Sequence, residues 1–174
     1  MLVGIDEAGR GALAGPLFIA ACELLRPLDE LKDSKKLNEK KREKLYKEII
    51  SNSNYLILAF SNAQIDTLGL SKCLQKGLEI IHLHFENKRK IFDGNTNYGV
   101  LGIENLIKAD NLIAEVSAAS ILAKVSRDKA MEFLALKYPQ YGFEIHKAYG
   151  TKTHKESIVK YGTCELHRLS FKLI

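Results

Sequence analysis

Two adjacent carboxylates near the start of the chain, Asp6 and Glu7, are the residues best suited to chemistry. They follow an apolar run, residues 1–5, that predicts a short buried strand, and the turn Gly9-Arg10-Gly11 comes directly after them. Side chains alternate between the faces of a regular strand, so both acids can serve one site only if the strand ends or twists at Glu7. Carboxylates held together repel each other unless a cation lies between them, and a hard divalent metal ion takes oxygen ligands. The alternative is a solvated strand end followed by a surface turn.

Two further acids follow apolar stretches later in the chain. Asp93 comes directly after residues 90–92, and Asp110 follows an expected strand over residues 102–108. Ligands collect at the carboxyl ends of parallel strands in open sheets, so acids at three such ends predict a carboxylate cage for one or two metal ions. Each acid also has a simpler interpretation, since Asp93 could belong to a hairpin turn and Asp110 could cap a helix. The pattern that the three strand ends share favours the metal site.

The remaining apolar patterns predict the elements that position these acids. Further strands are expected at residues 16–22 and 55–60. Asn38 is expected to cap a helix that runs to about residue 50, and Ser61 or Asn62 to cap a further helical region. Other helices are expected at residues 71–85, from about 116 to 137 with Ser117 as its cap, and at 155–161. Strands come first and then alternate with helices, which predicts an α/β protein with a mixed five-stranded central sheet flanked by helices.

Length and composition exclude several classes of protein. A chain of 174 residues predicts a single domain, 1–174, that buries a core without disulfides or a structural metal. The three cysteines are far apart and form no Cys-x-x-Cys pair, which argues against a zinc ribbon or a disulfide framework. No apolar run approaches the roughly 18 residues of a membrane span, and no signal peptide is recognisable. We therefore expect a cytoplasmic protein with no membrane partner.

The charge distribution suits a polyanionic partner. The net charge is +5, with basic clusters within residues 32–44 and 147–168 and acids in the middle of the chain. Such clusters can grip phosphates on either side of a metal-binding centre, and the alternative is two solvated faces.

Several motifs, in this order along nearly the whole chain, make the sequence similar to a known family. They are Gly4-Ile5-Asp6-Glu7-Ala8-Gly9-Arg10-Gly11, Asp33-Ser34-Lys35-Lys36-Leu37, Asp93-Gly94-Asn95, Lys108-Ala109-Asp110, the run from Ser117 to Asp128, and His167-Arg168-x-Ser170-Phe171. Together they resemble the type 2 ribonuclease H family, and bacterial ribonuclease HII in particular. The resemblance implies an RNase H-like fold with a small helical C-terminal segment.

The resemblance also implies an activity. The family hydrolyses the RNA strand of RNA–DNA hybrids and cuts on the 5′ side of a single ribonucleotide embedded in duplex DNA, leaving a 3′-hydroxyl and a 5′-phosphate. Such cutting serves ribonucleotide removal and RNA primer removal during replication and repair. By likeness, the catalytic and metal-binding carboxylates are Asp6, Glu7, Asp93 and Asp110. They would bind Mg²⁺ or Mn²⁺, with two ions per site.

Substrate contacts follow from the same resemblance. The backbone of Gly9, Arg10 and Gly11 would contact the 2′-hydroxyl, which distinguishes RNA from DNA. Tyr149 occupies the place of a tyrosine that stacks on the neighbouring deoxyribose. Further expected phosphate contacts are Lys35, Lys36 and Lys124. The part from about residue 138 would form a basic substrate-binding segment, and the protein would act as a monomer.

Two departures from the family pattern bear on the substrate loops. Ala12 and Gly150 stand where the family commonly has proline, which puts the preference for ribonucleotide junctions in question but not the chemistry. Two other function classes stay open at this point. One is a hybrid-binding module with a degenerate site, and the other is a nuclease or recombinase of the same broad fold that acts on DNA.

Overall fold

The centre of the molecule is a mixed five-stranded sheet in the order β3-β2-β1-β4-β5. The computed structural model describes residues 1–31 and 38–174. The strands are β1 (Leu2–Ala8), β2 (Leu17–Leu24), β3 (Ser53–Phe60), β4 (Arg89–Asp93) and β5 (Glu104–Leu106). β2 runs antiparallel to β1 and β3, whereas β4 runs parallel to β1 and β5. The predicted mixed sheet is confirmed, although β5 is shorter than the strand expected at residues 102–108.

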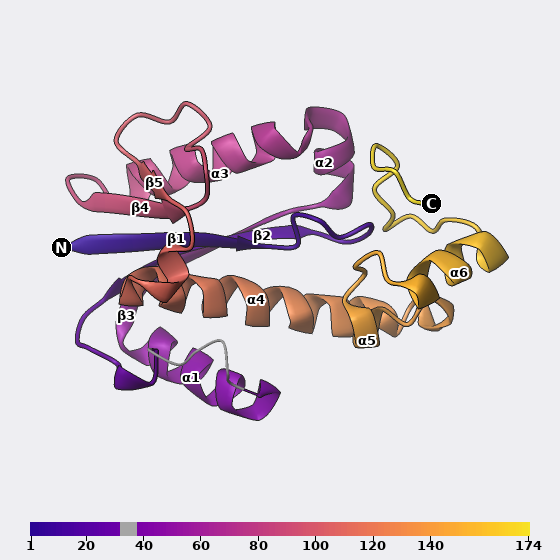
Figure 1. Cartoon of the computed structure of the whole chain (residues 1–174), viewed down its shortest axis with the longest axis horizontal. Coiled ribbons are helices and arrows are strands. Elements are labelled where there is room, and N and C mark those ends of the chain that lie inside the picture. Colours follow the sequence, from indigo (N-terminus) through magenta and orange to yellow (C-terminus); the bar gives the residue numbers. More distant parts are fainter. Residues whose placement is uncertain (32–37) are drawn as a thin grey trace.

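Helices cover both faces of this sheet (Figure 1). α1 (Glu39–Ser51) and α4 (Ala114–Ala135) lie on one face, and α2 (Asn62–Leu68) and α3 (Leu70–His84) lie on the other. The last helices along the chain are α5 (Phe143–His146) and α6 (Lys152–Tyr161), and the short 3-10 helices include η2 (Ala109–Asn111) and η3 (Pro139–Tyr141).

Polar side chains cap the starts of α1, α2 and α6, the last through Thr151. The Asn38 side chain accepts a hydrogen bond of 3.0 Å from the Lys41 N–H, as expected for the first residue before α1. Ser61 and Gln64 form a reciprocal capping box at the start of α2. The predicted cap of α4 is wrong, because that helix already begins at Ala114 and Ser117 lies inside it. The Ser117 hydroxyl instead donates to the Leu31 carbonyl at 3.3 Å.

The alternation of side chains along β1 places its two acids on opposite faces. Val3 and Ile5 pack into the cluster that contains Leu78 of α3. Ala8, two residues after Asp6, packs with residues of α1 and α4. Asp6 therefore faces α4, and Glu7 faces the side of α3.

The C-terminal segment has a small core of its own, which packs against the end of α4. Tyr141 and Phe143 stack at 5.3 Å and are buried with Ala14 and Met131. The sequence predicted one helix in this segment, at residues 155–161, and did not predict η3 and α5. No helix among the described residues has both the length and the apolar character needed to cross a membrane.

Candidate active site

Asp6 and Glu7 lie in the part of β1 that no longer pairs with its parallel neighbour β4. β1 pairs with β4 only as far as Ile5 opposite Phe92, but it pairs with β2 through Ala8. The expectation that both acids can serve one site only if the strand ends or twists at Glu7 is wrong, because β1 continues to Ala8 and both carboxyls still interact with Asp93. Asp6 and Glu7 lie where β1 extends past β4, at the carboxyl edge where ligands of parallel sheets gather.

Asp93 and Asp110 meet at the same edge. Asp93 is the last residue of β4, and its two carboxylate oxygens accept from the N–H groups of Lys108 at 3.0 Å and Asp110 at 3.3 Å. The expectation that Asp110 closes a strand is wrong, because β5 ends at Leu106 and Asp110 lies in η2. Since β4 and β5 are parallel, the hairpin-turn interpretation of Asp93 is excluded.

Burial and the charges of neighbouring acids raise the pKa values of three of the four carboxyls. Burial, followed by the charges of Glu7 and Asp93, raises the pKa of Asp6 well above its ordinary value, against an opposing hydrogen bond from Ser120. Burial and the charge of Asp93 also raise the pKa of Glu7, although Arg10 opposes them. Burial raises the pKa of Asp93 as well, and the neighbouring Asp110 carboxyl adds to that rise. Negative charge is thus concentrated at this edge of the sheet.

A hard divalent cation fits this set of donors. All four side chains offer carboxylate oxygens, and the Glu7 Oε2 atom is buried without a hydrogen-bond partner. A cation would offset the burial and the mutual repulsion that together raise the three pKa values. Within residues 1–31 and 38–174, no three His, Cys, Asp or Glu side chains are already close enough to form a metal-binding group.

The turn after β1 lies beside the acids and is shaped differently at its two glycines. Gly9 is buried with φ +94°, and a Cβ atom there would lie 2.0 Å from the Arg127 Nε atom. Gly11 has no atom within 4 Å of such a Cβ atom. The Arg10 side chain lies 3.4 Å from a Glu7 oxygen. The structure therefore explains Gly9 by internal packing, whereas the space at Gly11 is open.

Tyr149 comes to this turn from the C-terminal segment. Its backbone forms an isolated antiparallel bridge with Ala12, and its side chain is 37% exposed. The Arg127 guanidinium lies over the Tyr149 ring, with 5.2 Å between the guanidinium carbon and the ring centre. One face of this ring is thus held from inside the protein.

Of the three lysines expected to contact phosphates, the structure describes only Lys124. Lys35 and Lys36 lie outside the described residues. Lys124 lies one helical turn after Ser120 on α4, and its ammonium group donates to both oxygens of Asp128 at 2.7 Å.

Sequence reasoning assigned no role to several residues of this region. They are Tyr98, Ser120, Arg127 and Arg168. Ser120 binds the Asp6 carboxyl, and Arg10 lies 6.0 Å from the centre of the Tyr98 ring. No local pattern singles out Arg127, because Ser126, Asp128 and Lys129 beside it on α4 are also polar.

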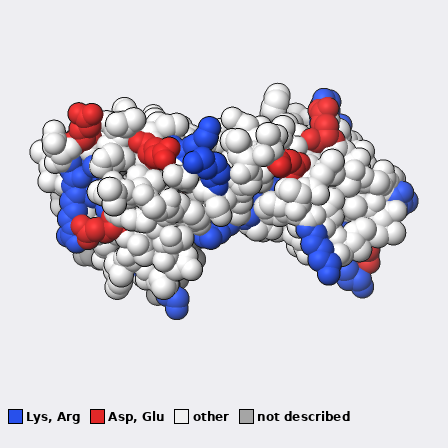
Figure 2. Space-filling view, turned by 90° about the horizontal axis from the view of Figure 1, so that it is seen from above, with Lys and Arg blue, Asp and Glu red and all other residues white. Residues whose placement is uncertain are grey.

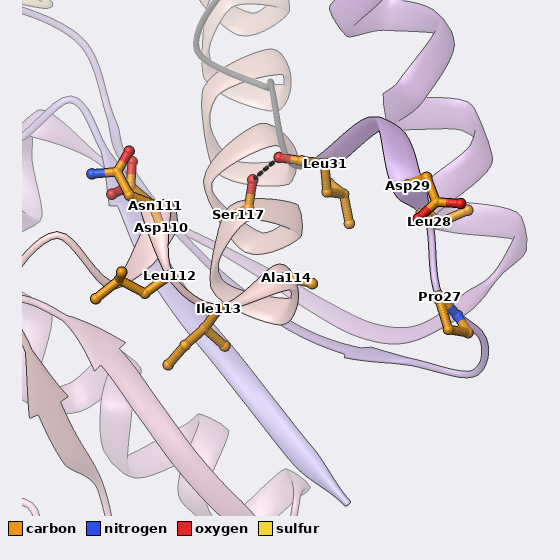
Figure 3. Close-up of a pocket in the computed structure, with 10 residues that line it drawn as sticks. All are labelled: Pro27, Leu28, Asp29, Leu31, Asp110, Asn111, Leu112, Ile113, Ala114 and Ser117. Carbon is orange, nitrogen blue, oxygen red and sulfur yellow. Dashed lines mark hydrogen bonds between the residues drawn. The ribbon is translucent and has the colours of Figure 1, made fainter.

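A cavity of about 280 Å³ adjoins the acidic site. Figure 3 shows it between the segment from Pro27 to Leu31, the residues of η2 and the first turns of α4. Asp110 is the member of the four acids that lines it. Figure 2 shows that the molecule is narrower between the sheet and the C-terminal segment, and that basic side chains lie beside this narrow part.

Comparisons with known proteins agree on one family. The family model described as ribonuclease HII matches residues 3–174. A ribonuclease HII of Campylobacter jejuni (serotype O:23/36, strain 81-176) is 65% identical over 174 residues, which cover 99% of this chain and 91% of that relative.

Solved structures share the fold over the whole chain. The structure of a PCNA:RNase HII complex from Archaeoglobus fulgidus superposes with a TM-score of 0.83 at 28% identity, covering 100% of this chain and 96% of that one. The ribonuclease H2 of Pyrococcus horikoshii OT3 superposes with a TM-score of 0.78 at 25% identity, covering 99% and 94%. The RNase H-like fold is thereby confirmed, and the chain belongs to the ribonuclease HII family of nucleases.

Proposed function

We propose that this protein is a metal-dependent endoribonuclease that hydrolyses the RNA strand of RNA–DNA hybrids. It also cuts on the 5′ side of single ribonucleotides in duplex DNA, leaving a 3′-hydroxyl and a 5′-phosphate. The observation that carries this proposal is the position of Asp6 and Glu7 where β1 extends past β4, because both carboxyls interact there with Asp93, which accepts a hydrogen bond from the Asp110 N–H. Membership of the ribonuclease HII family supports the same reaction.

The four acids hold Mg²⁺ or Mn²⁺, with two ions in the site. When bound, such a pair supplies an activated water and stabilises charge on the leaving oxygen of an in-line displacement. Asp6 and Glu7 contribute from β1, Asp93 from the end of β4 and Asp110 from η2. The N–H groups of Lys108 and Asp110 fix the orientation of the Asp93 carboxylate, because each binds a different oxygen.

The turn and Tyr149 select the ribonucleotide. The open space at Gly11 allows a sugar to approach the backbone, so that N–H groups of Gly9, Arg10 and Gly11 can reach a 2′-hydroxyl. Tyr149 stacks its exposed face on the neighbouring deoxyribose, while Arg127 holds the ring from the other side. Phosphate contacts are assigned to Lys35, Lys36 and Lys124, and further ones to the basic segment from about residue 138.

The substrate defines the cellular role and the assembly that we propose. An enzyme that cuts beside embedded ribonucleotides serves their removal from DNA, and one that hydrolyses hybrids serves RNA primer removal during replication. We propose that a single domain, residues 1–174, acts as a monomer.

A cleavage assay on matched duplexes tests this function. One labelled DNA duplex carries a single ribonucleotide, the second is an RNA–DNA hybrid, and the third is all DNA. With Mg²⁺ or Mn²⁺ we expect cutting of the first two only, with extension of the product by a DNA polymerase as evidence of the 3′-hydroxyl. Asp110→Asn should abolish cutting and leave duplex affinity nearly unchanged. Equal cutting of the all-DNA duplex would support a DNA nuclease, and binding without cutting by the native protein would support a hybrid-binding module.

A further inference from the structure

A buried arginine lies directly beneath the turn that follows β1. Arg168 is 0% exposed, and its guanidinium donates to three backbone carbonyls instead of to a carboxylate. Its Nη1 atom donates to the carbonyls of Gly9 at 2.7 Å and Arg10 at 3.2 Å, and its Nε atom donates to Gly15 at 3.0 Å. One nitrogen therefore holds two successive carbonyls of the turn.

This contact decides where the next two N–H groups of the turn point. The described part of the chain contains no cis peptide bond, and in a planar trans peptide the C=O and the following N–H point in opposite directions. Since the Gly9 and Arg10 carbonyls are directed inward to Arg168, the N–H groups of Arg10 and Gly11 are directed away from it. Successive N–H groups on one side of a turn form a concave site for electron-rich oxygen atoms.

The guanidinium is held in this place at an energetic cost. Burial lowers the pKa of Arg168 to about 10, and the nearby Arg127 adds to this effect. Arg127 is itself 1% exposed and donates to other carbonyls, those of Ala14, Pro16 and Lys147. A buried charge is unfavourable unless it is hydrogen-bonded, and the Arg168 Nη2 atom is buried without a hydrogen-bond partner. The contacts of Nη1 and Nε therefore provide the stabilisation of this charge and tie the carbonyls of the turn to Arg168.

We infer that Arg168 is a positioning residue for ribonucleotide recognition, because it fixes the turn so that the Arg10 and Gly11 N–H groups face the 2′-hydroxyl. The inference rests on the proposed function. Arg168 does not touch the substrate, and it acts through the backbone of the turn. Gly11, whose missing side chain leaves open space, then gives the sugar access to these two groups.

A binding experiment with the non-cutting Asp110→Asn protein tests the inference. Its affinity is measured for a duplex with one ribonucleotide and for the matched all-DNA duplex, before and after adding Arg168→Met. Loss of oriented N–H donors should lower the preference for the ribonucleotide by about tenfold and leave affinity for the all-DNA duplex nearly unchanged. Arg168→Lys keeps the charge without the planar fork, so we expect it to lose most of the preference as well. Full preference in either variant would overturn the inference.

A control separates this effect from a general loss of stability. Glu23 is 1% exposed at the opposite end of β2, where it binds Lys88 and Asn54, so Glu23→Gln also removes a buried charge. Glu23→Gln should keep the preference for the ribonucleotide even if it unfolds at lower temperature. A drop equal to that of Arg168→Met would show that stability alone sets the preference, and would overturn the inference.

A second measurement needs no substitution at Arg168. Amide hydrogen exchange followed by NMR should show fast exchange of the Arg10 and Gly11 N–H groups in the free protein. The ribonucleotide duplex should slow this exchange by tenfold or more, and the all-DNA duplex should not. Slow exchange in the free protein, or equal protection by both duplexes, would overturn the inference. If the native protein cuts neither duplex and Asp110→Asn binds both alike, the proposed function itself has failed.

Discussion

Replacing Asp6 by asparagine should stabilise the metal-free protein while abolishing its activity. Burial and the neighbouring charges of Glu7 and Asp93 disfavour the ionised Asp6 carboxyl, so its pKa is raised in the folded chain. Asparagine has nearly the same shape and carries no charge. Its amide oxygen can still accept the hydrogen bond that the Glu7 N–H makes to Asp6 at 2.7 Å. The substitution thus removes the unfavourable charge and keeps the local backbone contact.

The sign of the pH dependence follows from this raised pKa. The folded chain binds the Asp6 proton more tightly than the unfolded chain, so the contribution of this group to stability is fully present at low pH. It is lost as the pH rises from the ordinary carboxyl value, about 4, through the raised value. The penalty that the native protein carries therefore grows as the pH rises through this range. The advantage of Asp6→Asn is larger at pH 7.5 than at pH 4.0 and shrinks on acidification.

The magnitude can be worked from the cost of burying a charged group. A gain of about 1–3 kcal/mol is expected at pH 7.5, on the scale of unsatisfied buried polar groups in proteins. For a chain of this size, each kcal/mol corresponds to about 2–4 °C in the melting temperature. Thermal unfolding in a metal chelator at pH 7.5 and pH 4.0 measures both quantities. The reasoning would be refuted if Asp6→Asn were no more stable than the native protein at pH 7.5. It would also be refuted if the difference in melting temperature between the two proteins were the same at both pH values.

Asp66 offers a matched control of opposite sign. Although partial burial opposes it, hydrogen bonds from Ser170 and from the Leu169 N–H lower the pKa of Asp66. Such a group stabilises the fold above the ordinary carboxyl pKa and loses this contribution as the pH falls through the lowered value. Asp66→Asn should therefore destabilise the protein at pH 7.5, with a smaller effect at pH 4.0.

Three glycines give further predictions. Gly9→Ala should lower the free energy of unfolding by about 2 kcal/mol or more, because φ is +94° and the new Cβ atom would meet Arg127; unchanged denaturant unfolding would contradict this. Gly4→Ala should also destabilise the fold, since its Cβ atom would lie 2.1 Å from the Glu115 backbone; a native melting temperature would show that α4 can shift. Gly11→Ala should change the free energy of unfolding by no more than about 0.5 kcal/mol, because a Cβ atom there meets no other atom. It should slow cleavage beside a ribonucleotide at least tenfold. Cleavage at the native rate would show that the substrate does not need the open space at Gly11.

The sequence predicted those strands and helices whose bounds depend on a few neighbouring residues. The apolar run before Asp6 identifies β1, Asn38 identifies the start of α1, and Ser61 is one of the two caps, with Asn62, that were expected for α2. Each depends on a few neighbouring residues, and the structure confirms all three. The start of α4 was misplaced because its N-cap residue, Ile113, makes no side-chain cap.

Long-range contacts could not be predicted in the same way. The parallel pairing of β4 with β5 excludes a hairpin at Asp93, yet it depends on residues about a dozen positions apart. The place of Asp110 in η2 follows from the chain reversal after β5, where Lys108 has φ 58°. The burial of Arg168 beneath a turn at the other end of the chain has no local signal at all.

Manganese binding tests most directly whether Asp6, Glu7, Asp93 and Asp110 serve one metal site. Mn²⁺ is titrated into the native protein and into the four variants that replace one of these acids by its amide, with free Mn²⁺ measured by electron paramagnetic resonance. Asp66→Asn, which alters an acid outside the site, is the control. We predict that each of the four variants binds Mn²⁺ more weakly than the native protein and that Asp66→Asn binds it equally well. Native affinity in any one of the four would contradict the shared site.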